Sequence, residues 1–186
     1  MKIKKLSIGD LVFFSLIILF LIPQTRMQLK VGLNKIISKI NPVTIIEDHK
    51  QLNVSDVNFK LTGINTPSVT LNSMHGEVIF INFWATWCGP CVAEMPDLQK
   101  LYNKHRNSVN FLFITNDNTS KITEFLSRNT YNFPVYQLKT ALPEALEHTS
   151  IPTTYIIDQK GNIVVRKVGA ADWNSKRTNK LLAELY

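Results

Sequence analysis

The chain has 186 residues, of which 45% are hydrophobic, and it contains two cysteines. That length suffices for one domain with a hydrophobic core plus an appendage, and two cysteines cannot build a framework of several disulfides. The formal net charge is +7, but residues 1–45 hold seven of the 21 basic residues and one of the 14 acidic residues. The remainder is nearly neutral. A charge confined to a tail argues against nucleic-acid binding, and we expect no nucleic-acid partner.

An apolar segment lies near the N-terminus. Residues 11–22 are apolar except for Ser15, and the segment extends back to Leu6 with a few small or polar interruptions. A helix over residues 6–22 rises about 25 Å, slightly less than the roughly 30 Å hydrocarbon core of a bilayer. The sequence predicts an uncleaved transmembrane anchor. A cleaved signal peptide is the alternative, but residues 23–26 contain no small-residue cleavage site.

The chain divides into three parts. We expect residues 1–28 to form a cytoplasmic tip and the anchor, residues 29–56 an amphipathic stem and linker, and residues 57–186 a globular domain. In the stem, apolar residues at helical spacing alternate with lysines, so it could lie on a membrane surface or act as a spacer helix. The polar residues 47–56 indicate the linker.

Orientation in the membrane is not decided by charge, because basic residues flank the apolar segment on both sides. The short N-terminal flank and the large domain that follows favour export of the domain.

The globular part alternates strand and helix patterns. Residues 78–84 are apolar except for Asn82, which predicts a central strand buried on both faces. The other expected elements are hairpins at 57–61/67–71 and 153–157/163–168, strands at 109–115 and near 135, and helices at 88–105, 120–129, 141–148 and 173–185. The sequence therefore predicts an α/β domain.

Both cysteines fall in Cys88-Gly-Pro-Cys91, between the central strand and the first long helix. A thiolate is the attacking species in disulfide exchange, and the amides and dipole at a helix N-terminus lower a cysteine pKa below its free value of about 8.5. We predict that Cys88 attacks a target disulfide and that Cys91, one turn on and more buried, resolves the mixed disulfide. Trp87, beside Cys88, is expected to cover one side of the thiol.

A zinc half-site is the alternative for this cysteine pair. Structural zinc needs four ligands, and the chain has no second cysteine or Cys/His pair, while its four histidines are scattered. We expect no metal site and no cofactor beyond the redox-active disulfide.

Glu94 lies three residues after Cys91, on the next turn of the same expected helix. Its carboxylate could exchange a proton with a cysteine. A solvated glutamate that merely stabilises the helix start is the alternative.

The run Trp-Cys-Gly-Pro-Cys-x-x-Glu-x-Pro and the later Ile151-Pro152-Thr153 resemble the thioredoxin superfamily over residues 57–186. Within it, the N-terminal anchor and an extra segment at 130–150 are similar to the membrane-tethered TlpA/ResA-type thiol-disulfide reductases. The resemblance implies a thioredoxin-like fold, a central mixed sheet flanked by helices.

The resemblance also implies several site residues. Pro152 matches a cis-proline beside the active-site sulfurs, Thr153 would line the substrate groove, and Gly169 matches a glycine at the rim. An ordinary trans proline and a simple turn glycine are the alternatives. Thioredoxins proper carry aspartate where this chain has Asn82, and in the TlpA/ResA type the glutamate matching Glu94 takes part of that role.

The function that follows is a protein thiol-disulfide oxidoreductase, expected to reduce disulfides of extracytoplasmic proteins. The resemblance implies a bacterial cytoplasmic membrane location, an electron donor in the membrane and apocytochrome c as a client. Two alternatives use the same fold. A thiol peroxidase would resemble Pro-x-x-x-Thr-x-x-Cys, whereas Thr86 lies only two residues before Cys88. A copper carrier would add a distal histidine ligand, for which His148 is the candidate.

Overall fold

The computed structural model describes residues 7–21, 32, 42–138 and 140–186. Helix α1 (Ile8–Leu21) falls within the expected anchor. No helix in these described ranges is both long and apolar enough to cross a membrane. Both ends of the expected anchor, residues 6 and 22, and the expected stem apart from residue 32 lie outside the described residues.

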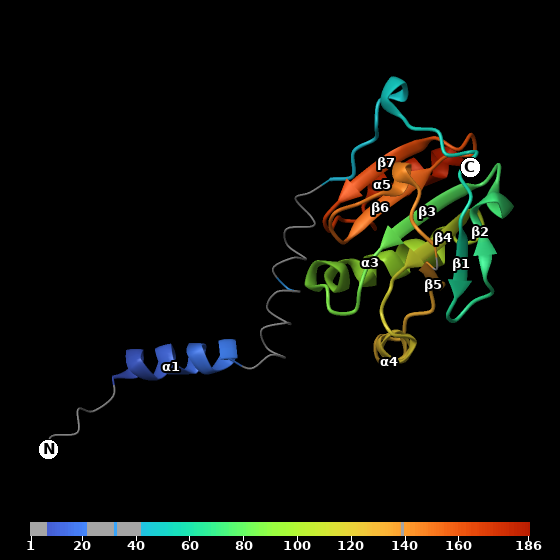
Figure 1. The fold of residues 1–186 in the computed structure, drawn as a ribbon. Helices are drawn as coiled ribbons and strands as arrows, with labels where there is room; N and C mark the ends of the chain where they lie inside the picture. The colour runs from blue at the N-terminus through green and yellow to red at the C-terminus, as the bar shows by residue number, and fades with distance from the viewer. Residues whose placement is uncertain (1–6, 22–31, 33–41, 139) are drawn as a thin grey trace, which may run out of the picture.

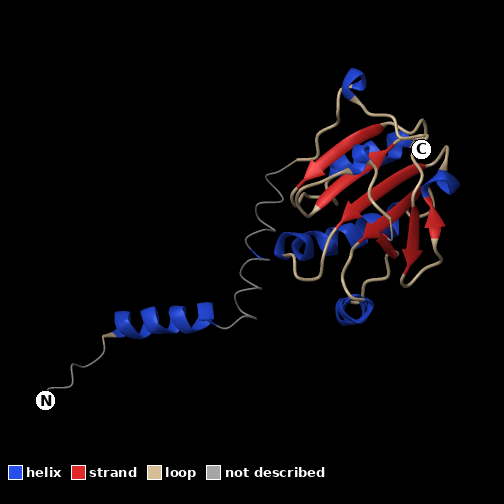
Figure 2. Ribbon diagram, viewed as in Figure 1, coloured by secondary structure: helices blue, strands red, loops and turns tan. Residues whose placement is uncertain are grey.

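The domain is built on a seven-stranded mixed sheet with the strand order β2-β1-β5-β4-β3-β6-β7, drawn as red arrows in Figure 2. The three central strands β3, β4 and β5 run parallel, and the remaining pairings are antiparallel. In chain order the strands are β1 (Lys60–Gly63), β2 (Val69–Thr70), β3 (Val78–Phe83), β4 (Val109–Ile114), β5 (Val135–Leu138), β6 (Thr153–Ile157) and β7 (Ile163–Val168). Both predicted hairpins and the buried central strand are confirmed.

Three long helices accompany the sheet: α3 (Gly89–His105), α4 (Thr119–Asn129) and α5 (Lys176–Leu185). Short 3-10 turns occur at η1 (Asp48–Lys50), η2 (Leu71–Met74) and η3 (Glu144–Leu146). Side chains satisfy amides at the helix starts, because Asn118 accepts from the Ser120 amide and Ser175 from the Thr178 amide. The combination confirms the predicted thioredoxin-like α/β fold (Figure 1).

Two hydrophobic cores lie on opposite faces of the sheet. Along β3, Phe80 belongs to the core that contains Met95 of α3, whereas Ile79 and Ile81 belong to the other core. Successive side chains of a strand alternate between faces. The same alternation puts Asn82 on the α3 side of the sheet, buried among apolar residues.

A buried histidine joins the C-terminal end of α3 to α5. The His105 ring nitrogens lie 2.9 Å from Asn179 Oδ1 and 3.1 Å from the Tyr186 hydroxyl. Because both nitrogens are engaged, this contact fixes α5 against the helix that carries the cysteines.

Two expected helices differ from the structure. The segment 141–148 forms only the short turn η3, because a proline disfavours helical geometry in the residue before it, and Pro143 and Glu147, on either side of the turn, are both extended. The last helix begins at Lys176 rather than Trp173, since Ser175 is its N-cap and Trp173 is buried in the core.

The expected linker at 47–56 also differs, because this part of the chain and the residues just before it pack against β7 and the turn that precedes it. The Ile46 amide donates to the Val164 carbonyl at 2.8 Å, and the Val54 amide donates to the Gly161 carbonyl at 2.7 Å. Val43 and Val54 are both buried. These residues therefore cover the outer edge of β7 as part of the folded unit.

The packing of this segment predicts an asymmetric effect of two neighbouring substitutions. Val43 is 3% exposed and Ile45 is 46% exposed. Val43→Ala should lower the free energy of unfolding by about 1–3 kcal/mol because it leaves a cavity, whereas Ile45→Ala should change it by less than about 0.5 kcal/mol. Urea unfolding of both variants measures this. Equal, small effects would mean that residues 43–45 do not pack against the folded domain.

Candidate active site

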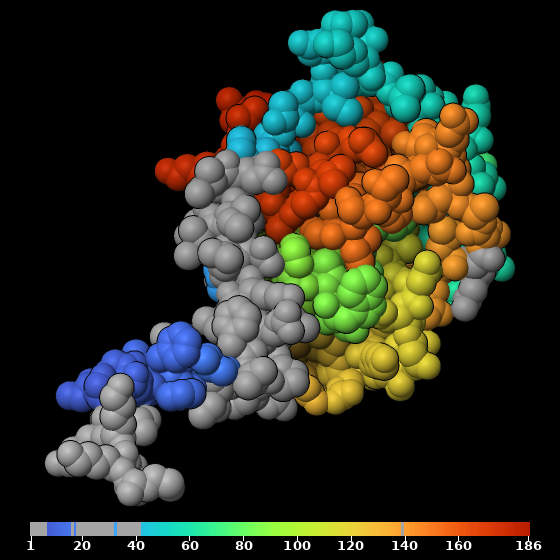
Figure 3. Space-filling model, turned by 60° about the vertical axis from the view of Figure 1, so that its left-hand side comes forward, coloured from blue at the N-terminus to red at the C-terminus, as the bar shows by residue number. Residues whose placement is uncertain are grey.

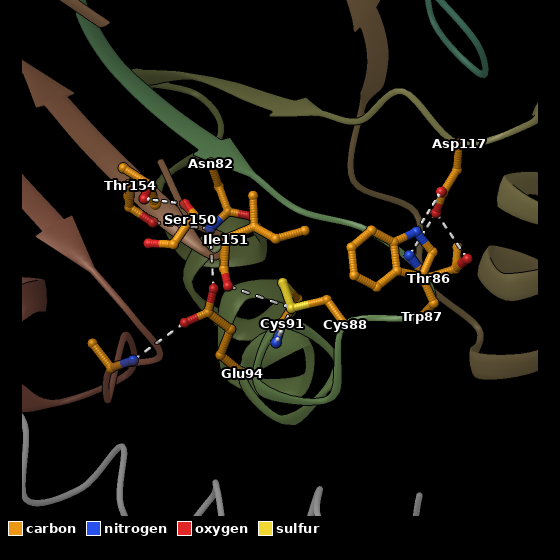
Figure 4. The surroundings of a disulfide bond; sticks show 12 residues. Asn82, Thr86, Trp87, Cys88, Cys91, Glu94, Asp117, Ser150, Ile151 and Thr154 are labelled. Atoms are coloured by element: carbon orange, nitrogen blue, oxygen red, sulfur yellow. Dashed lines mark hydrogen bonds between the residues drawn. A yellow bond between two sulfur atoms is a disulfide. The ribbon is translucent and has the colours of Figure 1, made fainter. Parts of the chain in front are cut away.

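The two cysteines lie where β3 passes into α3. Strand β3 ends at Phe83, a four-residue loop follows, and Cys88 is the N-cap of α3. Pro90 occupies the first turn, where its missing amide hydrogen costs no intrahelical bond. Cys88 and Cys91 are joined as a disulfide, with their Cα atoms 5.2 Å apart (Figure 4). The strand-to-helix junction thus brings the predicted redox pair together.

Both sulfurs are largely removed from solvent, and Cys91 is the more deeply buried. The Cys88 sulfur accepts a hydrogen bond from the Cys91 amide at 3.2 Å and lies 3.7 Å from the Ile151 carbonyl oxygen. In the reduced protein the same amide, at the positive end of the α3 dipole, would stabilise a Cys88 thiolate. This contact favours Cys88 over Cys91 as the attacking sulfur.

Glu94 is buried and not solvated, contrary to the simpler of its two interpretations. Its Oε1 accepts from Asn82 Nδ2 at 3.0 Å. Its Oε2 accepts from the Trp173 indole nitrogen at 2.8 Å and from the Ala171 amide at 3.2 Å. Burial raises the pKa of Glu94 from 4.5 to about 8, although all three donors act in the opposite direction. The carboxyl group can therefore gain or lose a proton near neutral pH.

The Ile151–Pro152 peptide bond is cis, which confirms the prediction for Pro152. This loop puts the Ile151 carbonyl beside the Cys88 sulfur. Gly169, at φ 81°, adopts a conformation that favours glycine and donates its amide to the Pro152 carbonyl at 2.8 Å. The loop is thereby tied to the chain that follows β7.

Thr153 does not line an open groove through its side chain. It is fully buried, and its hydroxyl donates to the Ser150 carbonyl at 2.7 Å. The expectation fails because Thr153 begins β6 and is directed into the sheet packing. Ile151 lines the surface groove instead.

Trp87 is 66% exposed, and its ring lies on the side of Asp117 rather than over the disulfide (Figure 4). Its indole nitrogen donates to Asp117 Oδ1 at 3.0 Å. Asp117 Oδ2 accepts from the Thr86 amide at 2.6 Å and from the Thr86 hydroxyl at 2.8 Å. Asp117 thus holds Thr86 and Trp87, the last two residues of the loop before Cys88, and the Trp87 ring lies away from the thiol that it was expected to cover.

A groove of about 370 Å³ runs beside this loop. Trp87, Asp117, His148 and Ile151 contribute to its walls. In the space-filling view of Figure 3, the surface formed by α3 is green and lies between orange and yellow segments of the chain. The groove borders the cis-proline loop at Ile151.

His148, the candidate copper ligand, stacks on Phe83 with ring centroids 4.2 Å apart, and its Nδ1 lies 3.3 Å from the Leu146 carbonyl. Within the described part of the chain, no three histidine, cysteine, aspartate or glutamate residues are grouped as a metal site. These contacts of His148 do not support the alternative of a copper carrier.

Sequence reasoning missed Asp117, Trp173, Thr154 and the role of Ile151. Asp117 had a signal, because it follows β4, and the carboxyl ends of parallel neighbours such as β3 and β4 meet at one edge of a sheet. Trp173 had none, since its contact with Glu94 spans 79 residues of sequence.

The sequence profile of the Redoxin family matches residues 52–182. The chain belongs to this family. The thiol-disulfide oxidoreductase ResA of Bacillus cereus (strain ZK / E33L) is 29% identical over 126 residues, which cover 66% of this chain and 73% of the relative. ResA of Halalkalibacterium halodurans is 33% identical over 111 residues, or 58% of this chain and 63% of that protein.

Solved structures agree with these relatives. A structure described as a putative thiol:disulfide interchange protein DsbE from Chlorobium tepidum has a TM-score of 0.61 and 26% identity, covering 72% of this chain and 97% of the other. StoA from Bacillus subtilis has a TM-score of 0.56 and 25% identity, covering 69% and 96%. Together with the disulfide at the start of α3, these relatives and solved structures identify the chain as a thiol-disulfide oxidoreductase of the ResA type in the thioredoxin superfamily.

The buried Glu94 predicts how stability depends on pH. An unfolded Glu94 ionises near 4.5, whereas the folded one keeps its proton up to about 8. The stability that this group contributes is complete below pH 4.5 and is lost as pH rises through 8, with a slope of at most about 1.4 kcal/mol per pH unit. Glu94→Gln should remove that slope from the free energy of unfolding of the oxidised protein.

The measurement is denaturant unfolding at a series of pH values from 4 to 9. Glu124→Gln is the matched control, because Glu124 lies on the exposed side of α4 in an i,i+4 ion pair with Arg128. It should retain the wild-type slope. Identical slopes in both variants would show that Glu94 titrates normally.

Proposed function

We propose that the chain reduces disulfides in proteins outside the cytoplasm by cycling Cys88 and Cys91 between dithiol and disulfide. The observation that carries the proposal is the Cys91 amide directed at the Cys88 sulfur from the start of α3. The Gly-Pro pair between the cysteines, which resembles reducing thioredoxins, supports the reducing direction.

In the first step the Cys88 thiolate attacks one sulfur of a client disulfide. A bond forms between Cys88 and the client, the client disulfide breaks, and its other sulfur leaves as a thiolate that takes a proton from water. The α3 amides lose a charged partner as the mixed disulfide forms. The Ile151 carbonyl oxygen lies 3.7 Å from the Cys88 sulfur, so the backbone of a bound client can pair with it beside the reacting sulfurs.

In the second step Cys91 attacks the Cys88 sulfur. The Cys91 thiol gives its proton to the Glu94 carboxylate, the Cys88–Cys91 bond forms, and the client's second sulfur leaves as a thiolate and is protonated. A pKa of about 8 suits Glu94 to this exchange, because a proton-transfer group works best near the ambient pH. The client gains two electrons, which a dithiol donor must return to the cysteine pair.

Trp87, Pro152 and the groove beside them supply the client contacts in this scheme. Trp87 is exposed, and Asp117 holds its ring at the groove wall. Pro152 keeps the Ile151 carbonyl at the disulfide. An extended client segment would therefore lie across the cis-proline loop.

The location outside the cytoplasm rests on the apolar segment 6–22 as an uncleaved anchor. With this orientation, the domain faces the periplasm or exterior of a bacterial cytoplasmic membrane. The electron donor is then a membrane dithiol protein, and apocytochrome c is the proposed client.

The activity is tested with the full chain in detergent, using insulin disulfides and a dithiol reductant. Cys88→Ser should reduce turnover to the rate of the reductant alone, since the attacking sulfur is gone. Cys91→Ser should instead accumulate a mixed disulfide, because nothing resolves it. Equal turnover by wild type and Cys88→Ser would refute the mechanism.

Equilibration with glutathione tests the direction of electron flow. A potential near that of thioredoxin, about −270 mV, is expected for a reductant, whereas one near that of DsbA, about −120 mV, would indicate an oxidant.

The topology has its own test. A reporter that is active only outside the cytoplasm, fused after Tyr186, should be active, and the same fusion without residues 6–22 should be silent. A cytoplasm-specific reporter at the same position is the matched control. Activity of only the cytoplasmic reporter would reverse the orientation.

A further inference from the structure

Glu94 is held by three donors that come from two separate parts of the chain. Asn82 Nδ2 reaches Oε1 from β3, while the Ala171 amide and the Trp173 indole reach Oε2 from the segment between β7 and α5. The indole contact is the shortest of the three, at 2.8 Å. Each group donates a hydrogen to a carboxyl oxygen, so an ionised Glu94 can accept all three hydrogen bonds.

The surroundings of Glu94 contain other polar and titratable groups, but its hydrogen-bond partners are neutral. On α3, Asp97 lies one turn further on and pairs with Lys100 at 3.3 Å. Asp172 precedes Trp173, and on β6 Thr154 accepts from Asn82. Lys167 of β7, opposite Thr154, donates to the Pro42 carbonyl. Cys91 lies one turn before Glu94 on α3 and is bonded to Cys88.

We propose that Trp173 is a positioning residue of the thiol-disulfide reaction, whose indole N–H holds the Glu94 carboxylate ready to accept the proton of Cys91. This inference rests on the proposed role of Glu94 and goes beyond it. Burial alone would keep Glu94 protonated to a higher pH. A donor aimed at Oε2 offsets part of that penalty and fixes the carboxylate orientation.

Packing alone does not account for an indole at this position. The Trp173 ring meets Phe80 edge to face, with centroids 5.1 Å apart and planes at 84°. A phenylalanine could supply a ring to that contact, but not the N–H. Trp173→Phe therefore separates the hydrogen bond from most of the apolar burial.

The chain provides a matched control in Trp84. Trp84 is also buried and packs against Phe125 and Phe133. Its indole nitrogen has no hydrogen-bond partner among the described residues. Trp84→Phe thus makes the same substitution in the same core without removing a hydrogen bond.

The direct test follows the Glu94 carboxyl carbon by NMR in the oxidised full chain labelled with ¹³C-glutamate. Trp173→Phe should shift its titration to higher pH by about one unit, because loss of a charge-assisted hydrogen bond corresponds to roughly a tenfold change in the protonation equilibrium. Asn82→Ala, which removes the donor to Oε1, should shift it in the same direction. Trp84→Phe should leave it unchanged.

A second measurement uses no substitution of Trp173, so it does not depend on whether such a variant folds. In wild-type protein labelled with ¹⁵N-tryptophan, the Trp173 indole N–H resonance should move with the Glu94 titration, and this movement should vanish in Glu94→Gln. The Trp84 resonance should stay constant. If the Trp173 resonance is insensitive to Glu94, or if Trp173→Phe shifts the titration no more than Trp84→Phe does, Trp173 only packs and the proposal is wrong.

The kinetic consequence distinguishes this proposal from the proposed function. The pH profile of insulin reduction by Trp173→Phe should move in the alkaline direction by the same amount as the Glu94 titration. An unmoved profile despite a shifted titration would remove Glu94 from the rate-limiting proton transfer and leave disulfide reduction intact. Absence of reduction by wild type would refute the function, while the NMR titrations would still decide the contact between Trp173 and Glu94.

Discussion

The hydrogen bond from the Cys91 amide to the Cys88 sulfur is the constraint on which the site is built. The first amides of any helix lack intrahelical acceptors, so the N-cap residue must supply one. Here the acceptor is sulfur, which is a weak partner when bonded in a disulfide or protonated and a strong one as a thiolate. The start of α3 is therefore better satisfied in the reduced, ionised state, and the stability of the helix is coupled to the chemistry.

The buried carboxyl group of Glu94 imposes a second constraint. Burying a charge away from solvent is costly. Here hydrogen-bond donors on Asn82, Ala171 and Trp173, rather than a counter-ion, offset part of that cost. An ion pair would hold Glu94 permanently ionised. Neutral donors only lessen the cost, and they leave the pKa at about 8, where the group can exchange protons. Neutral donors therefore suit a proton-transfer group better than an ion pair would.

Local features of the sequence predicted the order of strands and helices and the cysteine pair, because short motifs and alternation determine them. The cis-proline was predicted only from the resemblance of Ile151-Pro152-Thr153 to the thioredoxin superfamily. The helix predicted over 141–148 is wrong, because Pro143 and Glu147 are extended and leave only a short turn between them. The buried Thr153 and the rotated Trp87 were missed for another reason. Side-chain direction depends on partners far away in sequence, such as Asp117, which lies 30 residues beyond Trp87. The contact of Trp173 with Glu94 likewise exists only in the folded chain.

The segment from Gly169 to Trp173 connects the two halves of the site. At one end the Gly169 amide binds the Pro152 carbonyl in the loop that would receive the client. Within a few residues, the same segment donates to Glu94 on α3. Because five residues span both contacts, the position of the donors to Glu94 is tied to the position of the Pro152 loop. The positive φ of Gly169 allows the sharp turn that this geometry needs. The proposed proton transfer at Glu94 and the proposed client binding at Ile151 thus both involve this short segment, in which Ala170, Ala171 and Trp173 are buried.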